Sequence, residues 1–373
     1  MTRLHAMFKL GIIQDYIPRY RADFFNLLRS RLRKEDVDLN VLSYAPLGAQ
    51  RARRDFVKLD FLEEFPQWQV SVGKRSLVFP RHVHKFQEFD GLIGSLRGSS
   101  FSTHFMIGHC QRNKKPFGLW GHVRNYVNSD NFVDLWIEKY QMRLATSIFA
   151  YTDSGREFGI QRGIERNKFF VLNNTFDYSN LEHELANLNS NELQTLKDSL
   201  KLFPQKTVLF IGGLDSSKRI NFLASTLDQL WSIDPEVKLL VIGEGEDKHL
   251  LNRAVARSQV IFLDNHSQKS KAIASRIAKL ILMPGRIGLV AVDSIILGIP
   301  IVTTNYAFHA PEFDYLVEGK SKFTSKLDTP TSFAEIVIRL LKSPDSLSFL
   351  QPPPSVENML NAFVQGVLRM KQS

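Results

Sequence analysis

A chain of 373 residues, 43% of them hydrophobic, is long enough to form two domains with separate cores. Its single cysteine, Cys110, excludes an internal disulfide and favours a reducing compartment. We expect Cys110 to be buried and to pack as a small apolar side chain. The first residues lack an apolar signal segment. The most apolar region, 278–304, is interrupted by Pro284, Arg286, Asp293 and Pro300, so no single helix of it can span a membrane. These features predict a cytoplasmic protein.

Strands and amphipathic helices alternate through the first half. We expect strands, in chain order, at residues 9–14, 38–44, 90–94, 117–120, 147–151 and 169–174. Amphipathic helices are predicted between them at 22–33, 132–145 and 153–163.

The predicted helix at 22–33 has two interpretations. Apolar residues surround its basic cluster at near-helical spacing: Phe24, Phe25, Leu27, Leu28 and Leu32. This pattern is typical of a basic amphipathic helix lying on a bilayer surface. It is equally typical of the first helix of an α/β domain with a solvated basic edge.

The positive charge is concentrated in the first third of the chain and indicates an anionic partner. Residues 1–122 hold 20 Lys and Arg against 11 Asp and Glu, whereas the whole chain has a net charge of +10. A one-sided basic region predicts contact with lipid headgroups or nucleic acid. The chain has no nucleic-acid-binding motif, so an anionic membrane surface is the favoured partner and nucleic acid is not expected.

The second half repeats the alternation of strands and helices. Strands are expected at 207–211, 237–242, 260–263, 280–283 and 300–304. The polar stretch 178–206 is interpreted as a joining helix or linker, and 355–371 as an amphipathic helix. The pattern predicts an α/β protein made of two Rossmann-like, doubly wound parallel-sheet domains that face a cleft. The boundaries are 1–177 for the first domain, 178–206 for the linker, 207–350 for the second domain and 355–373 for the last helix.

The most informative segment is 283–304, with the sequence MPGRIGLVAVDSIILGIPIVTT. Its order is a buried strand end, a glycine turn, a helix and another strand. This order exposes the first N–H groups of a helix at the mouth of a parallel sheet, where they favour a phosphate. Gly285 and Gly288 permit close approach of a ligand, and Asp293 offers a carboxylate to sugar hydroxyls. The alternative is an ordinary βαβ crossover whose glycines serve packing.

Four ordered segments resemble retaining GT-B glycosyltransferases of glycosyltransferase family 4. They are VLFIGGLDSSKRI at 208–220, LLVIGEGEDKHLL at 239–251, the 283–304 segment and HAPEFDYLVEG at 309–319. The family motif has two glutamates separated by seven residues, with Gly-Leu between them. Here Gly285 and Asp293 take the glutamate positions and Gly288-Leu289 is kept. The resemblance implies a GT-B fold, with the acceptor on the first domain and a nucleotide-sugar on the second.

The resemblance implies roles for named residues of the second domain. Lys218 matches the family's phosphate lysine, whereas the adjacent arginine falls at Gly213, with Arg286 and Arg219 as candidates to replace it. Asp293 would hold the ribose, and Glu312 would take part of the sugar contact of the missing first glutamate. The nucleotide-sugar set is Gly212, Gly213, Lys218, Gly285, Arg286, Gly288, Leu289, Val290, Asp293 and Glu312.

The first domain carries less specific resemblances. In GLWGHVRN, at 118–125, His122 follows a strand end and is the predicted catalytic residue, hydrogen-bonded to the donor sugar or the leaving phosphate. The alternative is a structural histidine. The loop after the first strand resembles the family's acceptor-side loop, which makes Asp15, Tyr16 and Arg19 candidate acceptor contacts or an ordinary surface loop.

These observations predict a metal-independent, retaining hexosyltransferase-type enzyme of polysaccharide biosynthesis. Its donor would be a UDP- or GDP-sugar, and its acceptor a glycan or a lipid-linked saccharide, with peripheral contact to the cytoplasmic face of a membrane. No metal ligand set with known spacing is present, and no cofactor is expected besides the donor. Two alternatives stay open: a non-catalytic GT-B subunit, favoured by Gly213 and Gly285, and a GT-B nucleotide-sugar epimerase.

Overall fold

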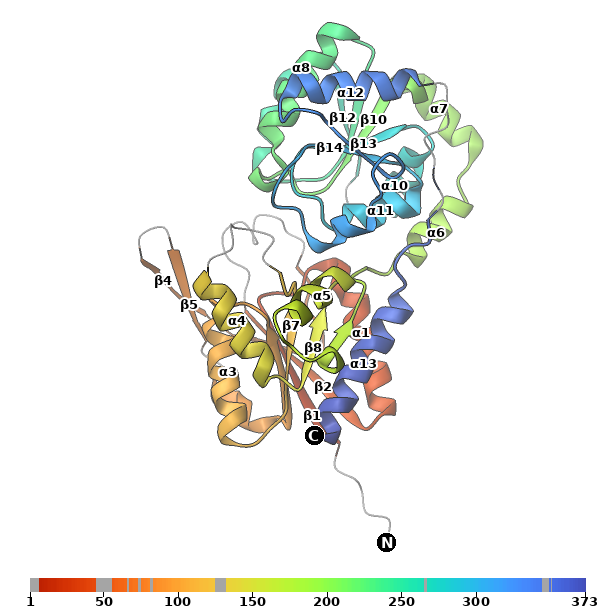
Figure 1. The fold of residues 1–373 in the computed structure, drawn as a ribbon. Helices are drawn as coiled ribbons and strands as arrows, with labels where there is room; N and C mark the ends of the chain where they lie inside the picture. Colours follow the sequence, from red (N-terminus) through yellow and green to blue (C-terminus); the bar gives the residue numbers. More distant parts are fainter. Residues whose placement is uncertain are drawn as a thin grey trace. The chain divides into compact units, whose positions relative to one another are not determined.

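The computed structural model describes residues 7–44, 56–65, 67–72, 75–80, 83–124, 132–264, 267–343, 349 and 351–373. It divides into two compact units, shown in Figure 1. Unit 1 comprises Met1–Asp177 and Pro354–Ser373, and unit 2 comprises Tyr178–Pro353. In both units every described strand of the main sheet runs parallel to its neighbours.

The main sheet of unit 1 has seven strands in the order β3-β2-β1-β6-β7-β8-β9. The strands are β1 (Phe8–Gln14), β2 (Val37–Tyr44), β3 (Leu62–Phe65), β6 (Gly91–Ser95), β7 (Phe117–Gly121), β8 (Ser147–Ala150) and β9 (Phe169–Val171). The central strands are buried at almost every position, as expected for a parallel sheet covered on both faces. A separate antiparallel hairpin pairs β4 (Gln67–Val72) with β5 (Arg75–Pro80).

Helices cover both faces of this sheet, and each face has its own core. One core includes residues of α1 (Ala22–Lys34) and α13 (Val356–Gln372). The other includes residues of α3 (Phe101–Arg112) and α4 (Phe132–Leu144), with α5 (Asp153–Gln161) packed beside them. Cys110 of α3 lies fully buried in the second core, and burial raises its pKa to about 12.

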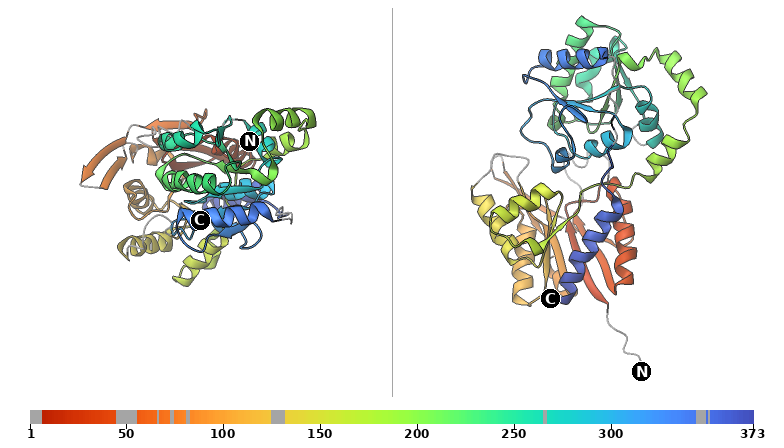
Figure 2. Two further views of the ribbon diagram at one scale, coloured as in Figure 1. Left: turned by 90° about the horizontal axis from the view of Figure 1, so that it is seen from above. Right: turned by 45° about the vertical axis from the view of Figure 1, so that its right-hand side comes forward.

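Helix α13 is the last element of the chain and completes the core of unit 1. Phe363 stacks on Phe149 of β8, with ring centroids 4.3 Å apart. Gly366 packs so closely that a Cβ there would lie 2.3 Å from the Phe149 ring. At the helix start, Arg31 of α1 forms an ion pair with Glu357. Figure 1 and the right view of Figure 2 show α1 and α13 side by side.

Helix α1 is the first helix of an α/β domain rather than a helix free to lie on a bilayer. Its side chains Phe24, Phe25, Leu28 and Leu32 are at most 1% exposed, because they pack into the core shared with α13. Leu27 alone of the five apolar residues named above is exposed. The interpretation of α1 as a membrane-binding helix is therefore wrong.

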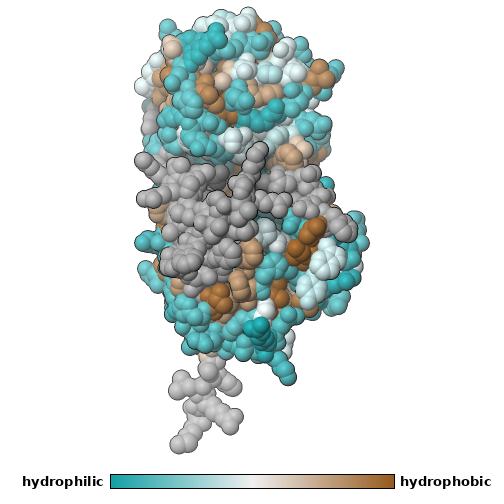
Figure 3. Space-filling model, turned by 90° about the vertical axis from the view of Figure 1, so that its left-hand side faces the viewer, coloured by the Kyte–Doolittle hydropathy of each residue, from teal (hydrophilic) through white to brown (hydrophobic). Residues whose placement is uncertain are grey.

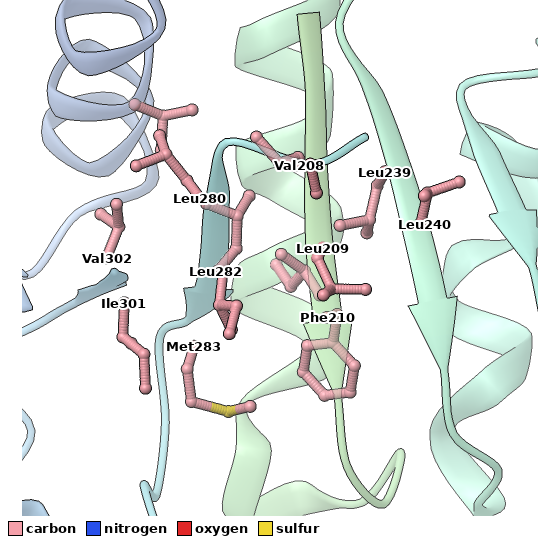
Figure 4. Packing of buried hydrophobic residues seen from close by; sticks show 14 of the residues in the cluster. Val208, Leu209, Phe210, Leu239, Leu240, Leu280, Leu282, Met283, Ile301 and Val302 are labelled. Atoms are coloured by element: carbon pink, nitrogen blue, oxygen red, sulfur yellow. The ribbon is translucent and has the colours of Figure 1, made fainter. Parts of the chain in front are cut away.

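Unit 2 contains a six-stranded sheet in the order β12-β11-β10-β13-β14-β15. The strands are β10 (Thr207–Ile211), β11 (Lys238–Ile242), β12 (Val260–Phe262), β13 (Leu280–Met283), β14 (Ile301–Thr303) and β15 (Lys322–Thr324). Figure 4 shows Leu209 and Phe210 of β10 between Leu239 of β11 and Leu282 of β13. This uninterrupted apolar packing fixes the relative positions of the strands that end at the candidate site.

The helices of unit 2 are α6 (Ser179–Ala186), α7 (Ser190–Leu200), α8 (Ile220–Ile233), α9 (Asn252–Ala256), α10 (Gln268–Ser275), α11 (Val290–Leu297) and α12 (Pro330–Lys342). The polar stretch expected to be a joining helix or linker forms α6 and α7. Among the described residues, no helix is both long enough and apolar enough to cross a membrane.

Candidate functional site

The candidate site lies at the carboxyl edge of the sheet of unit 2, where the strand order reverses. From β10 the chain builds outward first to β11 and β12, and then on the other side to β13, β14 and β15. In open parallel sheets, ligands bind outside the strand ends at such a switch point. The loops that follow β10 and β13 are residues 212–219 and 284–289.

Backbone packing requires the glycines in the turns that follow β10 and β11. A Cβ on Gly243 would lie 1.9 Å from the carbonyl oxygen of Gly212, and a Cβ on Gly245 would lie 2.2 Å from that of Leu214. Gly212 also has a φ of 143°, which side chains rarely adopt. Its N–H donates to the carbonyl oxygen of Ile242 at 3.0 Å. The backbones of the two turns are therefore in direct contact and hold each other in place beside the switch point.

The turn at Gly285 is equally tight. A Cβ there would lie 2.5 Å from the carbonyl oxygen of Ser217 and 2.6 Å from the carbonyl carbon of Lys218. The N–H of Arg286 donates to the Ser217 oxygen at 2.8 Å, and Nζ of Lys218 donates to the carbonyl oxygen of Arg286 at 2.5 Å. Backbone thus fills the space beside position 285. This packing explains why the first glutamate of the resembled motif is absent here.

Helix α11 begins at the switch point without a side-chain cap. Within the described part of the chain, its N-cap Leu289 makes no capping side-chain hydrogen bond. Gly288 precedes it with ordinary space around it, since a Cβ there would lie 3.6 Å from Cβ of Ala310. The opening formed by Gly288, Leu289 and Val290 therefore offers backbone N–H groups and a helix dipole suited to a phosphate.

Glu312 lies at the same opening. It belongs to the short helix η7 (Pro311–Tyr315) and is 3% exposed. Its Oε2 is 3.9 Å from the position of a Cβ on Gly288. A carboxylate near a helix N-terminus is stabilised by the helix dipole. The structure thus places Glu312 beside the start of α11, and its part in a sugar contact stays a prediction.

His309 holds the loop after β13 from the other side. Its Nδ1 accepts the N–H of Ile287 at 3.1 Å, and the carbonyl oxygen of Ile287 accepts the N–H of Ala310 at 2.7 Å. The imidazole stacks on Phe313 with ring centroids 3.9 Å apart. Burial, helped by the nearby charge of Lys322, lowers the pKa of His309 to about 4. The ring is therefore neutral near pH 7 and serves as a fixed acceptor for the loop.

Acid is expected to destabilise unit 2 through His309. In the unfolded chain this histidine titrates near 6.5, so the unfolded state binds a proton first as the pH falls. Its contribution to stability is complete above pH 6.5 and declines toward pH 4, with a loss of about 2 kcal/mol by about pH 5. Thermal unfolding at neutral and acidic pH checks this against His309→Asn, which keeps an acceptor but does not titrate. Equal acid sensitivity in both proteins contradicts it.

Asp293, the predicted ribose ligand, is buried in an ion pair. Its Oδ1 lies 2.7 Å from Nζ of Lys271 on α10, and its side chain is 7% exposed. Sequence reasoning did not identify Lys271, because no motif links α10 to α11. A carboxylate has about four acceptor positions, so the pair orients Asp293 and still permits a hydroxyl contact. The ribose role of Asp293 stays a prediction.

The two candidate replacements for the family arginine lie in different surroundings. Nη1 of Arg219 donates to Asp328 at 2.6 Å and to the hydroxyl of Thr304 at 3.0 Å. Arg219 therefore ties the loops of the sheet edge together. Arg286 is half-buried on the loop itself, close enough for its charge to lower the pKa of His309. Of the two, Arg286 is the better candidate for a phosphate contact.

In unit 1, His122 directly follows β7, as predicted. Its half-buried ring packs edge-on against Tyr151, with centroids 4.8 Å apart. The next residue, Val123, has a φ of 61°, which is rare for a β-branched side chain. Such strain costs about 1–3 kcal/mol and concentrates at functional sites. It favours a site role for His122, although that role stays a prediction.

Arg21 is a candidate that the sequence did not single out as a site residue. It is 5% exposed, and its guanidinium lies 5.3 Å from the centroid of Trp120. Nη2 donates to Oδ1 of Asn174 at 2.5 Å. Burying a charged arginine costs free energy unless the guanidinium is hydrogen-bonded or lies over aromatic rings, and Arg21 has both kinds of contact at this edge of the sheet.

The predicted acceptor-side residues follow β1 at the same edge of unit 1. Asp15 and Arg19 are exposed, and Tyr16 is half-buried. Asp15 lies 3.6 Å from Arg97, which follows β6. The structure thus brings a charged pair to the surface at this edge, and contact with an acceptor stays a prediction.

Comparison with solved structures identifies the fold. The superposition on HepE of Anabaena, solved with UDP, covers 98% of both chains, with a TM-score of 0.61 and 14% sequence identity. UDP-GlcNAc 2-epimerase from Neisseria meningitidis, bound to UDP-GlcNAc, covers 97% of this chain and 100% of its own with a TM-score of 0.64 at 14% identity. The chain has the GT-B fold. This result confirms the predicted fold class.

Sequence comparison matches part of the chain to a family model and most of the chain to a distant relative. Residues 205–343, which include the whole sheet of unit 2, match the family model "Glycosyl transferases group 1". The chain is also 22% identical over 362 residues to the 2-deoxystreptamine N-acetyl-D-glucosaminyltransferase of Niallia circulans, covering 90% of this chain and 88% of the relative. These two matches support a glycosyltransferase with the GT-B fold.

Proposed function

We propose that this GT-B protein transfers a sugar from a nucleotide-sugar to a glycan or lipid-linked saccharide, with retention and without a metal ion. The observation that carries the proposal is the convergence of Lys218 and the uncapped start of α11 at the switch point of unit 2. A cation and aligned N–H donors can stabilise the departing nucleoside diphosphate. HepE and the Neisseria epimerase were solved with UDP or a UDP-sugar, which favours UDP as the nucleotide to test first.

In this proposal each residue set has a defined task. Lys218, Arg286 and the N–H groups of Gly288, Leu289 and Val290 bind the diphosphate. Asp293, held by Lys271, binds the ribose. Glu312 and His122 contact the donor sugar, and the surface around Asp15, Tyr16 and Arg19 receives the acceptor. The reaction would take place in the cytoplasm.

The direct test is incubation with UDP-GlcNAc, UDP-glucose and a GDP-sugar, each without acceptor, with an oligosaccharide, with a lipid-linked saccharide and with 2-deoxystreptamine, followed by mass spectrometry. The last acceptor follows the activity named for the Niallia relative. Release of nucleoside diphosphate together with a glycosylated product supports the proposal. NMR of the anomeric proton of the product then tests retention.

The same incubations separate the two alternatives when they are also analysed by proton NMR, because an epimer has the same mass as its parent nucleotide-sugar. Formation of an epimeric nucleotide-sugar without acceptor would identify an epimerase, an activity carried by several proteins with this fold. Tight nucleotide binding without turnover on any acceptor would identify a non-catalytic subunit. The group 1 glycosyl transferase match over unit 2 favours transfer over both.

Chelation is expected to leave activity unchanged. Across the described residues, no three His, Cys, Asp or Glu side chains gather into a metal site. Fixed cations and N–H groups would stabilise the leaving group instead. Turnover should be equal with and without excess EDTA. Loss of turnover that manganese or magnesium restores would overturn the metal-independent mechanism.

Arg286→Ala is expected to lower turnover about ten- to hundredfold, as for a lost charge-assisted hydrogen bond, with little change in the thermal midpoint. Adding Gly213→Arg should restore part of the activity if both positions serve one phosphate. A Cβ at position 213 would lie 3.1 Å from Oδ2 of Asp215, so the new arginine can also pair with that carboxylate. The rescue is therefore expected to be partial. Wild-type kinetics in Arg286→Ala would remove Arg286 from the site.

A further inference from the structure

Helix α4 of unit 1 presents an apolar stripe to solvent. Val133 is 58% exposed, Trp136 61% and Tyr140 53%, and the exposed Arg143 continues the line. These positions are spaced by three, four and three residues, which places them on one face of the helix. The opposite face carries Met142, which is fully buried in the core. Whereas α1 buries its apolar face, α4 therefore has large apolar side chains on both its inner and its outer face.

The aromatic side chains of this stripe form an ordered surface. The rings of Trp136 and Tyr140 are nearly parallel, with an interplanar angle of 8° and centroids 6.2 Å apart. Phe105 of α3, on the same side of the sheet, is 48% exposed. Figure 3 shows apolar and aromatic side chains on the face of unit 1 that carries these two helices. Contiguous exposed apolar groups of this kind mark a contact surface.

The charge of the molecule indicates the nature of the contact. Unit 1 holds 29 Lys and Arg against 19 Asp and Glu, whereas unit 2 holds 19 of each. The whole net charge of +10 therefore belongs to unit 1. On α4 itself Lys139 and Arg143 are balanced by Asp134 and Glu138, so the excess positive charge belongs to the rest of unit 1. An anionic surface would attract unit 1 and leave unit 2 electrostatically indifferent.

We propose that the outer face of α4, formed by Val133, Trp136, Tyr140 and Arg143, docks on an anionic lipid bilayer. Trp and Tyr prefer the membrane–water interface, because their rings are apolar and their N–H and O–H groups remain hydrated. Lys and Arg beside them contact lipid phosphates and are attracted by an anionic surface. This combination is typical of interfacial helices. The positive charge and the aliphatic Val133 favour a bilayer over a neutral glycan.

Docking through α4 would bring one edge of unit 1 to the lipid surface. The loop after β6 packs on α4, since the N–H of Gly98 donates to Oε1 of Glu138 at 3.1 Å. The same loop carries Arg97, which pairs with Asp15. An acceptor anchored in the bilayer would thus meet the predicted acceptor-side residues. This consequence rests on the proposed function, whereas docking itself does not.

Vesicle co-sedimentation of the full chain tests the proposal. Wild-type protein should bind vesicles that contain about one third phosphatidylglycerol, and bind pure phosphatidylcholine vesicles at least tenfold more weakly. Trp136→Ser combined with Tyr140→Ser should lower the partition coefficient at least tenfold, and Arg143→Gln about fivefold. Phe203→Ser is the matched control, because Phe203 is 55% exposed but belongs to unit 2.

Three results would overturn the proposal. They are no binding of the wild type to anionic vesicles, equal binding by the double variant, or equal loss in the control. Thermal unfolding and nucleotide binding must be unchanged in the double variant, and Arg143→Gln gives an independent answer if that variant misfolds. A stripe that instead joins two copies would appear as a dimer in light scattering that the double variant abolishes, without vesicle binding. Absence of turnover with normal vesicle binding would contradict the proposed function alone.

Discussion

Lys218→Ala is expected to weaken binding of a nucleoside diphosphate at least tenfold, which corresponds to about 1.4 kcal/mol. The lysine ends the short helix η5 (Ser216–Lys218), and its Nζ bonds the carbonyl oxygen of Arg286 at the opening of α11. An ammonium group carries three donors, so it can hold this loop and contact a phosphate oxygen together. Its removal loses both the charge and the order of the loop. Calorimetric titration with UDP measures the loss.

A control separates loss of charge from loss of loop order. Lys218→Arg keeps the charge and should retain more affinity than Lys218→Ala, although its planar group differs from a point charge. Lys206→Ala removes a lysine that pairs with Asp234 and Glu236 away from the switch point, and should leave nucleotide affinity unchanged. Equal affinity of wild type and Lys218→Ala would remove Lys218 from the site.

Restoring the family glutamate by Gly285→Glu is expected to damage the protein rather than improve it. A Cβ at this position would lie 2.5 Å from the Ser217 carbonyl oxygen, and backbone cannot move aside as a flexible side chain can. Overpacking of this kind costs about 1–3 kcal/mol or more. We expect a thermal midpoint several degrees lower and nucleotide binding at least tenfold weaker, because the loops after β10 and β13 must separate.

Gly288→Ala is the matched control in the same loop. Its Cβ would meet Ala310 at 3.6 Å, an ordinary contact, so stability should change by less than about 1 kcal/mol. Gly285→Ala should already show most of the destabilisation of Gly285→Glu, because the first added carbon makes the clash. A stable Gly285→Glu protein with enhanced donor use would contradict the packing account.

The sequence predicts the central strands well, because a parallel strand covered on both faces is a continuous apolar run. The segments of β10 and β13 are of this kind, and the structure confirms them with the predicted bounds. Short strands at the edge of a sheet lack such a run, and β3 and β15 were not predicted for that reason. Helix α3 was also missed, because its apolar residues are mixed with histidines and follow no clear helical period.

The candidate site could be predicted only where residues adjacent in sequence stay adjacent in space. The glycine turns and the start of α11 were found, since each is contained in one local motif. The ion pair between Lys271 and Asp293 joins two helices, and the hold of His309 on Ile287 spans 22 residues. The backbone that leaves no room for a side chain at position 285 belongs to Ser217 and Lys218, almost 70 residues earlier in the chain. Tertiary contacts of this kind leave no periodic signal in a single sequence.

The return of α13 to unit 1 determines the order in which the chain can fold during synthesis. Unit 2 is continuous in sequence, so it can close its core once Pro353 has left the ribosome. Unit 1 cannot close at that stage, because Met359, Phe363 and Val367 belong to its core and are translated later. Until then Phe149 and Trp120 lack their partners on α13. A nascent chain that stalls between the two events therefore carries a finished unit 2 and an exposed apolar sheet face in unit 1, the state that chaperones recognise.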